Sequence, residues 1–259
     1  MSKYLKTLQI SFRYGLKNYK ALIGLSVFLI ICIVIFFHLW EVIAAKTAAV
    51  HMNRKALLWY IALNEWMLIA LPHVERNIHG DLKSGKLAYL LPRPISYLGF
   101  CFFESLGTLL VNLLGLGVIA FGITYALVGG LSLPLSFWIV SAILTIMAGC
   151  LGILIQMIIG LSSFWLHDVE PVYWIWEKFL FALGGLILPL AIYPQGWQIV
   201  AKFSPFPYIL GERSALALNY SLSHALSIMG NLAIWIGLAL AVLNWVYYKG
   251  LKILNIEGG

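Results

Sequence analysis

Residues Gly80 to Leu87 come closest to a motif that carries chemistry. They read GDLKSGKL and nearly match the loop GxxxxGKS or GxxxxGKT, whose backbone N–H groups and lysine hold nucleotide phosphates. The match fails at Leu87, because the hydroxyl group that would bind Mg²⁺ is missing. No buried strand precedes the segment, and no α/β domain is available to present it. We therefore expect no nucleotide or other cofactor on this chain.

Three polar residues, Asn64, Glu65 and Glu104, lie inside apolar stretches of the sequence. Ionisable side chains within a membrane are costly and by default mark function. We take these three as candidate lining of a translocation path. The alternative, polar contacts between helices with no part in substrate binding, is the commoner role and stays open for Glu65 and Glu104.

Residues typical of catalysis or metal binding form no pattern. The chain contains no GxSxG or HExxH motif. Its six histidines and three cysteines are scattered, without ligand spacing or a disulfide framework. We therefore expect neither catalytic residues nor a metal site, and an intramembrane enzyme is disfavoured.

The composition is that of an all-α integral membrane protein. Apolar residues make up 62% of the 259 positions and charged residues 10%, against roughly 45–50% and about 25% in soluble domains. The net charge of +7 comes from residues at the ends of apolar runs, as expected beside anionic lipid rather than nucleic acid. We expect one transmembrane domain over residues 1–259.

Six apolar runs are near or above the ~20 residues that a helix needs to cross about 30 Å of hydrocarbon. The predicted spans are 21–44, 56–72, 98–126, 135–165, 172–193 and 224–248. The second is the weakest, because it carries Asn64 and Glu65. No internal repeat is visible, which disfavours secondary transporters built from two matching halves.

Lys and Arg in the connections predict the orientation. The N-terminal tail, the 73–97 connection and the C-terminal tail together carry eleven, and the other side carries five, including Arg213. Both termini are therefore predicted to be cytoplasmic. The cluster Lys46, Arg54 and Lys55 runs against this orientation, and loss of the second span would move the C-terminus outside.

Two amphipathic helices are predicted on the cytoplasmic side. In residues 1–20, basic and apolar side chains each recur every three or four positions, as in a helix lying in the membrane interface. A second helix is predicted over 78–91 and stopped by Pro92 and Pro94. Its two faces suit docking into a groove of a soluble partner; they consist of Ile78, Leu82, Leu87 and Tyr89, and of Asp81, Lys83 and Lys86.

The segment DLKSGKLAYLLPRPIS, from Asp81 to Ser96, resembles the first cytoplasmic connection of ABC type-2 permeases. A second stretch also resembles that family and comprises Phe164, Trp165, Glu170, GGLILPL at 184–190, Tyr193, Pro194, Trp197 and PFPY at 205–208. No motif is specific alone, whereas together, over most of the chain, they indicate the family. The branch is one whose ATPase is a separate chain.

The resemblance implies a mechanism. Two permease chains, identical or similar, would line a central path, and each would dock on a cytoplasmic ATPase through helix 78–91. ATP and Mg²⁺ would bind only to the ATPase. Asp168 and Glu170, between the fourth and fifth spans, would form a smaller second contact with it. Residues 194–220, rich in proline and aromatics, would form re-entrant helices at the external end.

The function expected from this resemblance is export of an amphipathic or hydrophobic substrate across a bacterial cytoplasmic membrane. Two alternatives remain open from the residues, namely an ATP-independent secondary transporter and a membrane assembly protein without transport activity.

Overall fold

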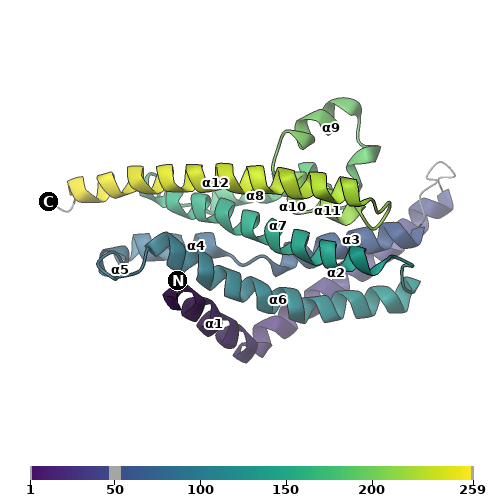
Figure 1. The fold of residues 1–259 in the computed structure, drawn as a ribbon, viewed down its shortest axis with the longest axis horizontal. Helices are drawn as coiled ribbons and strands as arrows, with labels where there is room; N and C mark the ends of the chain where they lie inside the picture. The colour runs from purple at the N-terminus through teal and green to yellow at the C-terminus, as the bar shows by residue number, and fades with distance from the viewer. Residues whose placement is uncertain (1, 47–53, 258–259) are drawn as a thin grey trace.

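Five long helices form an elongated bundle in the computed structural model, which describes residues 2–46 and 54–257 (Figure 1). They are α2 (Tyr19–Lys46), α3 (Arg54–Ala70), α6 (Tyr97–Val128), α7 (Leu135–Leu161) and α12 (Leu222–Glu257). The core lies mainly among α3, α6 and α7, where Met67, Leu116 and Leu144 are fully buried. The described residues contain no strand.

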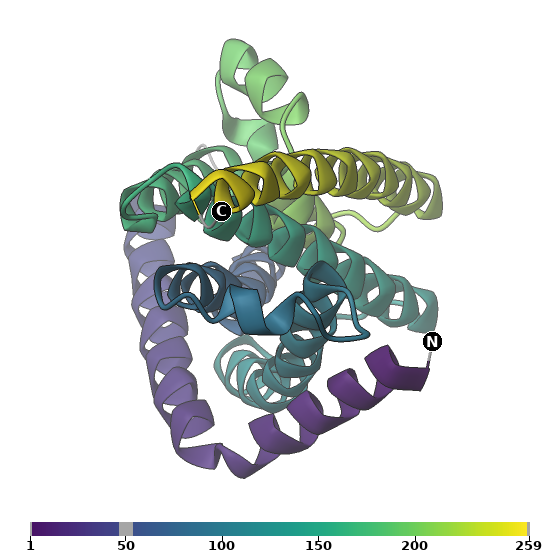
Figure 2. The ribbon, with the colours of Figure 1, turned by 90° about the vertical axis from the view of Figure 1, so that its left-hand side faces the viewer.

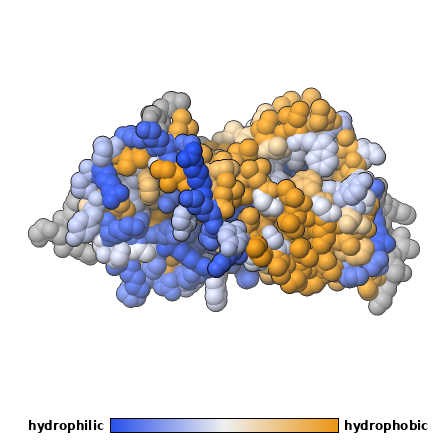
Figure 3. All heavy atoms as spheres, turned by 90° about the horizontal axis from the view of Figure 1, so that it is seen from below, coloured by the Kyte–Doolittle hydropathy of each residue, from blue (hydrophilic) through white to orange (hydrophobic). Residues whose placement is uncertain are grey.

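Shorter helices precede and connect the five long ones. They are α1 (Ser2–Lys17), α4 (Val74–Lys83), α5 (Leu87–Leu90), η1 (Ser162–Phe164), α8 (Glu170–Leu183), η2 (Leu190–Ile192), α9 (Gln195–Lys202), α10 (Phe206–Ile209) and α11 (Gly211–Ala215). The beginning of α1, the α4–α5 connection and the end of α12 share one end, on the left of Figure 1. We call it the polar end, because Figure 3 shows hydrophilic surface there and apolar surface over the middle of the molecule.

The described residues contain five helical stretches long and apolar enough to cross a membrane. They are Tyr19–Val42, Arg54–Lys83, Tyr97–Val128, Leu135–Phe164 and Leu222–Ile253. These coincide with five of the six predicted spans. The chain is therefore a multi-pass, all-helical membrane protein.

The predicted fifth span, 172–193, is wrong in extent. Helix α8 has 14 residues and ends at Leu183, which at 1.5 Å per residue is about 21 Å. Gly185 then adopts a positive φ of 70°, a conformation that glycine reaches without steric cost and that ends a helix. Short helices replace the continuous span from there to α12.

Helix α1 runs across the bundle rather than along it and packs on α6 (Figure 2). The two helices meet at Gly107, where a Cβ atom would lie 2.7 Å from the Leu8 carbonyl oxygen and 2.8 Å from the Ser11 Cβ. The Ser11 hydroxyl donates to the Glu104 carbonyl oxygen (2.6 Å). Of the apolar face predicted to enter lipid, Leu8 and Phe12 are partly buried.

We expect Gly107→Ala to destabilise the protein by about 1–3 kcal/mol, because the new methyl group overpacks a contact made by backbone atoms. The measurement is the apparent unfolding temperature in mild detergent. Gly122→Ala, on the same helix with nothing within 4 Å of the added Cβ, is the control. Equal unfolding temperatures for the two variants would contradict the close α1–α6 contact.

Candidate coupling site at the polar end

The α4–α5 connection joins two membrane-crossing helices, α3 and α6, at the polar end. Pro72 interrupts the first of them between Ala70 and Val74, because proline offers no N–H to the helical ladder. A single helix over 78–91 is not present. The chain turns between Lys83 and Leu87, where Gly85 has φ 69° and the Ser84 hydroxyl donates to the Gly80 carbonyl (2.7 Å).

Two of the predicted docking residues point into the protein. Ile78 is 0% and Leu87 is 1% exposed, so in this structure they hold the connection on the core. Gly160 of α7 lets α4 approach closely, since a Cβ there would lie 2.9 Å from the Ile78 Cβ. Leu82 is partly buried, whereas Lys83, Lys86 and Tyr89 are exposed.

The carboxylate of Asp81 binds two side chains of the same chain. It accepts hydrogen bonds from Lys86 (2.9 Å) and from the hydroxyl of Tyr97 (3.2 Å), the first residue of α6. The bond to Asp81 raises the pKa of Lys86 above its ordinary value, so the ammonium group stays charged at neutral pH. Asp81 therefore fixes the turn to α6 and presents Lys86.

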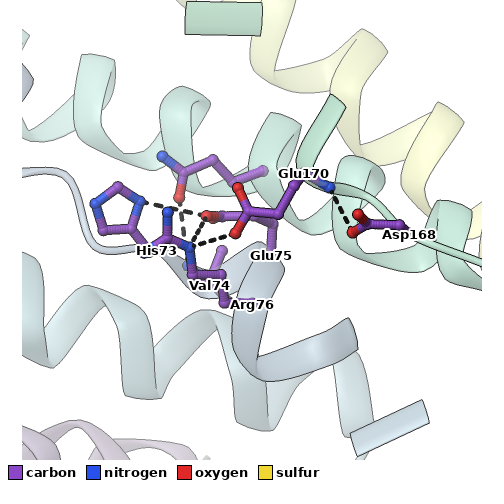
Figure 4. A network of polar contacts seen from close by, with 7 residues as sticks. His73, Val74, Glu75, Arg76, Asp168 and Glu170 are labelled. Atoms are coloured by element: carbon purple, nitrogen blue, oxygen red, sulfur yellow. Dashed lines mark hydrogen bonds and ion pairs between the residues drawn. The ribbon is translucent and has the colours of Figure 1, made fainter. Parts of the chain in front are cut away.

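A second polar network joins α4 to the beginning of α8 (Figure 4). Arg76 Nε lies 3.0 Å from Glu170 Oε1 and 3.8 Å from Glu75 Oε1. The Glu170 N–H donates to Asp168 Oδ1 (3.1 Å). Asp168 and Glu170 were predicted to form a second contact with an ATPase. In this structure Glu170 pairs with Arg76 of α4, and Asp168 binds the first residue of α8.

The centre of this network is Glu75, whose side chain is 1% exposed. His73 Nδ1 lies 3.3 Å from its Oε1. The Gln156 amide has two orientations, one accepting from the Val74 N–H (3.4 Å) and one donating to the Pro72 carbonyl and to Glu75 Oε2 (3.3 Å). We assign the second, because it pairs both acceptors with a donor.

The predicted path residues do not meet in one site. Asn64 is fully buried, and its amide donates to the carbonyls of Gly185 (3.2 Å) and Leu186 (3.1 Å). Glu65 is 4% exposed and forms no hydrogen bond or ion pair with the described residues. Glu104 lines a cleft beside α1. In this structure the Asn64 amide therefore binds the backbone of the segment that follows α8.

Arg213, treated in the sequence as a charge of an external loop, is fully buried. Its guanidinium donates to Thr145 Oγ1 of α7 (2.9 Å) and to the Leu63 carbonyl of α3 (2.8 Å). The pattern that signals this role is weak, since a lone arginine between GE and SA in an aromatic-rich loop also suits an exposed position. The network of Glu75, Arg76 and Gln156 was also missed, because the Arg76–Glu170 and Gln156–Glu75 contacts join residues distant in sequence.

A match to a protein-family model accounts for most of the chain: residues 53–258 match the ABC-2 family transporter protein. The chain belongs to this family. No curated protein matches it. Membership makes the chain a membrane transport component of a kind that generally works with ATPase partners. Helix α1 and α2 lie outside the match.

Within residues 2–46 and 54–257 of this ABC-2 protein, no group of three or more His, Cys, Asp or Glu side chains is placed to hold a metal ion.

We expect Asn64→Asp to destabilise the protein by about 1–3 kcal/mol, since a carboxylate cannot donate and would face two carbonyl oxygens in a buried position. Apparent unfolding temperatures of the purified variants measure this effect. Asn219→Asp is the control, because Asn219 is exposed in the turn between α11 and α12. A path-lining Asn64 would instead tolerate the change as well as Asn219 does.

Proposed function

We propose that this chain is the transmembrane subunit of an exporter whose ATP is hydrolysed on a separate ATPase chain. Its cargo is an amphipathic or hydrophobic molecule. The observation that carries the proposal is the α4–α5 connection, which lies at the polar end, is anchored in the core, and still presents exposed side chains outward.

The surface proposed to contact the ATPase is smaller than the sequence suggested. It consists of Lys83, Lys86 and Tyr89, and Tyr89 is 79% exposed. An exposed aromatic residue beside two cations is the kind of anchor that enters a pocket of a partner. Ile78 and Leu87 hold this surface rigidly to the bundle from within.

Three connections carry movement of this surface into the membrane. Helix α4 continues from α3 across Pro72, Asp81 binds Tyr97 at the start of α6, and Arg76 pairs with Glu170 at the start of α8. A rigid-body displacement of α4–α5 by the ATPase therefore acts on three helices together. These polar pairs are partly exposed and can break and re-form, so they suit an interface between helices that move.

Six crossings explain the topology best. Helix α1 begins and α12 ends at the polar end (Figure 1), which favours an even number of crossings, with the sixth made by α8 and the segment after it. The same end carries the larger share of Lys and Arg, which supports its placement in the cytoplasm. We place the protein in a bacterial cytoplasmic membrane, with both termini cytoplasmic.

The segment 194–220 supports a re-entrant arrangement at the external end. Helix α9 projects from the bundle (Figure 1), and α11 returns into it, where Arg213 contacts α3 and α7. A second permease chain completes the path in this proposal. The lipid-exposed apolar residues of α2, such as Ile23, Val27 and Ile31, leave a face free for lipid or that second chain.

Reversal of the Arg76–Glu170 pair tests the coupling. We expect Arg76→Glu and Glu170→Arg each to lower ATP hydrolysis by the purified permease–ATPase complex several-fold, because like charges then separate α4 from α8. The double reversal should recover a large part of the rate, as coupled residues do in a double-mutant cycle. The complex is reconstituted in nanodiscs, and phosphate release is measured.

Glu212→Arg is the control, since Glu212 pairs with His224 at the start of α12, away from the polar end. Additive losses in the double reversal would contradict a role of the pair in coupling. Purification of the chain without any ATPase from membranes that contain one would contradict the proposed function itself.

A further inference from the structure

A cleft of about 710 Å³ is lined by residues of α1, α2, α6 and the junction of α3 with α4. Its volume lies within the ~300–1,000 Å³ typical of sites for small organic ligands. Two of its walls, α1 and α2, lie outside the residues that match the family model. The cleft is therefore built partly from a segment that the family match does not include.

The walls of the cleft are divided between apolar and polar side chains. Leu22, Leu25 and Ile69 supply apolar surface, whereas Asn77, Ser105 and Glu104 supply polar groups. Such a division fits an amphiphile, because its chain and its headgroup need different surroundings.

Among the described residues that line the cleft, Glu104 is the one carboxylate and none is Lys or Arg. Its backbone carbonyl accepts from Ser11 (2.6 Å) and Thr108 (3.4 Å), but among the described residues no donor binds its carboxylate. The charged residues Asp81 and Lys86 are paired with each other at 2.9 Å. The cleft therefore presents one carboxyl group that no described residue binds.

We propose that this cleft binds an amphiphile with an ammonium headgroup, whose nitrogen donates to the Glu104 carboxylate and whose alkyl chain lies along Leu22, Leu25 and Ile69. Binding itself does not depend on an ATPase. The further assignment of this amphiphile as cargo on its way to the path rests on the proposed export function.

Photolabelling of the full chain alone tests the site. The probe is dodecylamine with a diazirine at the end of its chain, compared with the corresponding alcohol and sulfate, in nanodiscs of zwitterionic lipid. We expect the amine to label peptides of residues 21–25 or 69–71 at the lowest concentration and the sulfate at the highest. Mass spectrometry locates the label, and empty nanodiscs give the background.

Glu104→Gln should raise the amine concentration needed for half-maximal labelling about tenfold, equivalent to ~1.4 kcal/mol, and leave that of the alcohol unchanged. Glu212→Gln, outside the cleft, should change neither. The proposal is overturned if amine and sulfate label alike, if Glu104→Gln behaves as wild type, or if the label lies outside the cleft. Since no ATPase is present, these results are independent of whether the chain couples to one.

Discussion

Hydrocarbon offers backbone groups no water, so each N–H and C=O inside the bundle must find a partner in the protein. The break after Leu183 frees carbonyls where a continuous helix would have used them. They are bonded from elsewhere in the chain: the Gly184 carbonyl accepts from the Gly211 N–H (2.8 Å), and that of Gly185 accepts from the Tyr60 hydroxyl and from Asn64. The irregular segment is therefore stable only because α3 presents polar side chains to it, and this requirement ties α3, α8 and α11 into one unit.

That unit extends to the other end of the molecule. Helix α3 leads across Pro72 into α4, whose Arg76 pairs with Glu170 at the base of α8. The α3–α4 segment is thus bound twice to α8 and the residues that follow it, by buried hydrogen bonds from α3 near the break and by an ion pair from α4 at the polar end. Buried bonds of this kind are costly to break, whereas a half-exposed ion pair contributes little and exchanges easily. Movement is therefore expected at the polar end, while the far connection acts as a fixed point.

The long spans could be predicted from the sequence, because length and hydropathy are local properties of a run of residues. The ends of the helices could not be predicted in this way. Gly85 divides the predicted helix 78–91, and Gly185 follows the early end of α8, and each needed the positive φ that only the folded chain reveals. The roles of buried polar residues were still harder to predict. Asn64 was identified as unusual, but its partners lie over a hundred residues away, and nothing local separates a bonded amide from one that lines a path. Family resemblance drew attention to the α4–α5 connection, and the structure leaves only a few of its predicted docking side chains exposed.

The most direct test of the account replaces Tyr89 with a photo-crosslinking phenylalanine analogue in cells and asks what it captures. The account predicts a covalent product with an ABC-type ATPase, identified by mass spectrometry. It predicts none when the same analogue replaces Phe203, which is 82% exposed just after α9 near the other end. Capture of the ATPase from position 203, or from neither position in cells shown to contain it, would contradict the docking of an ATPase at the polar end.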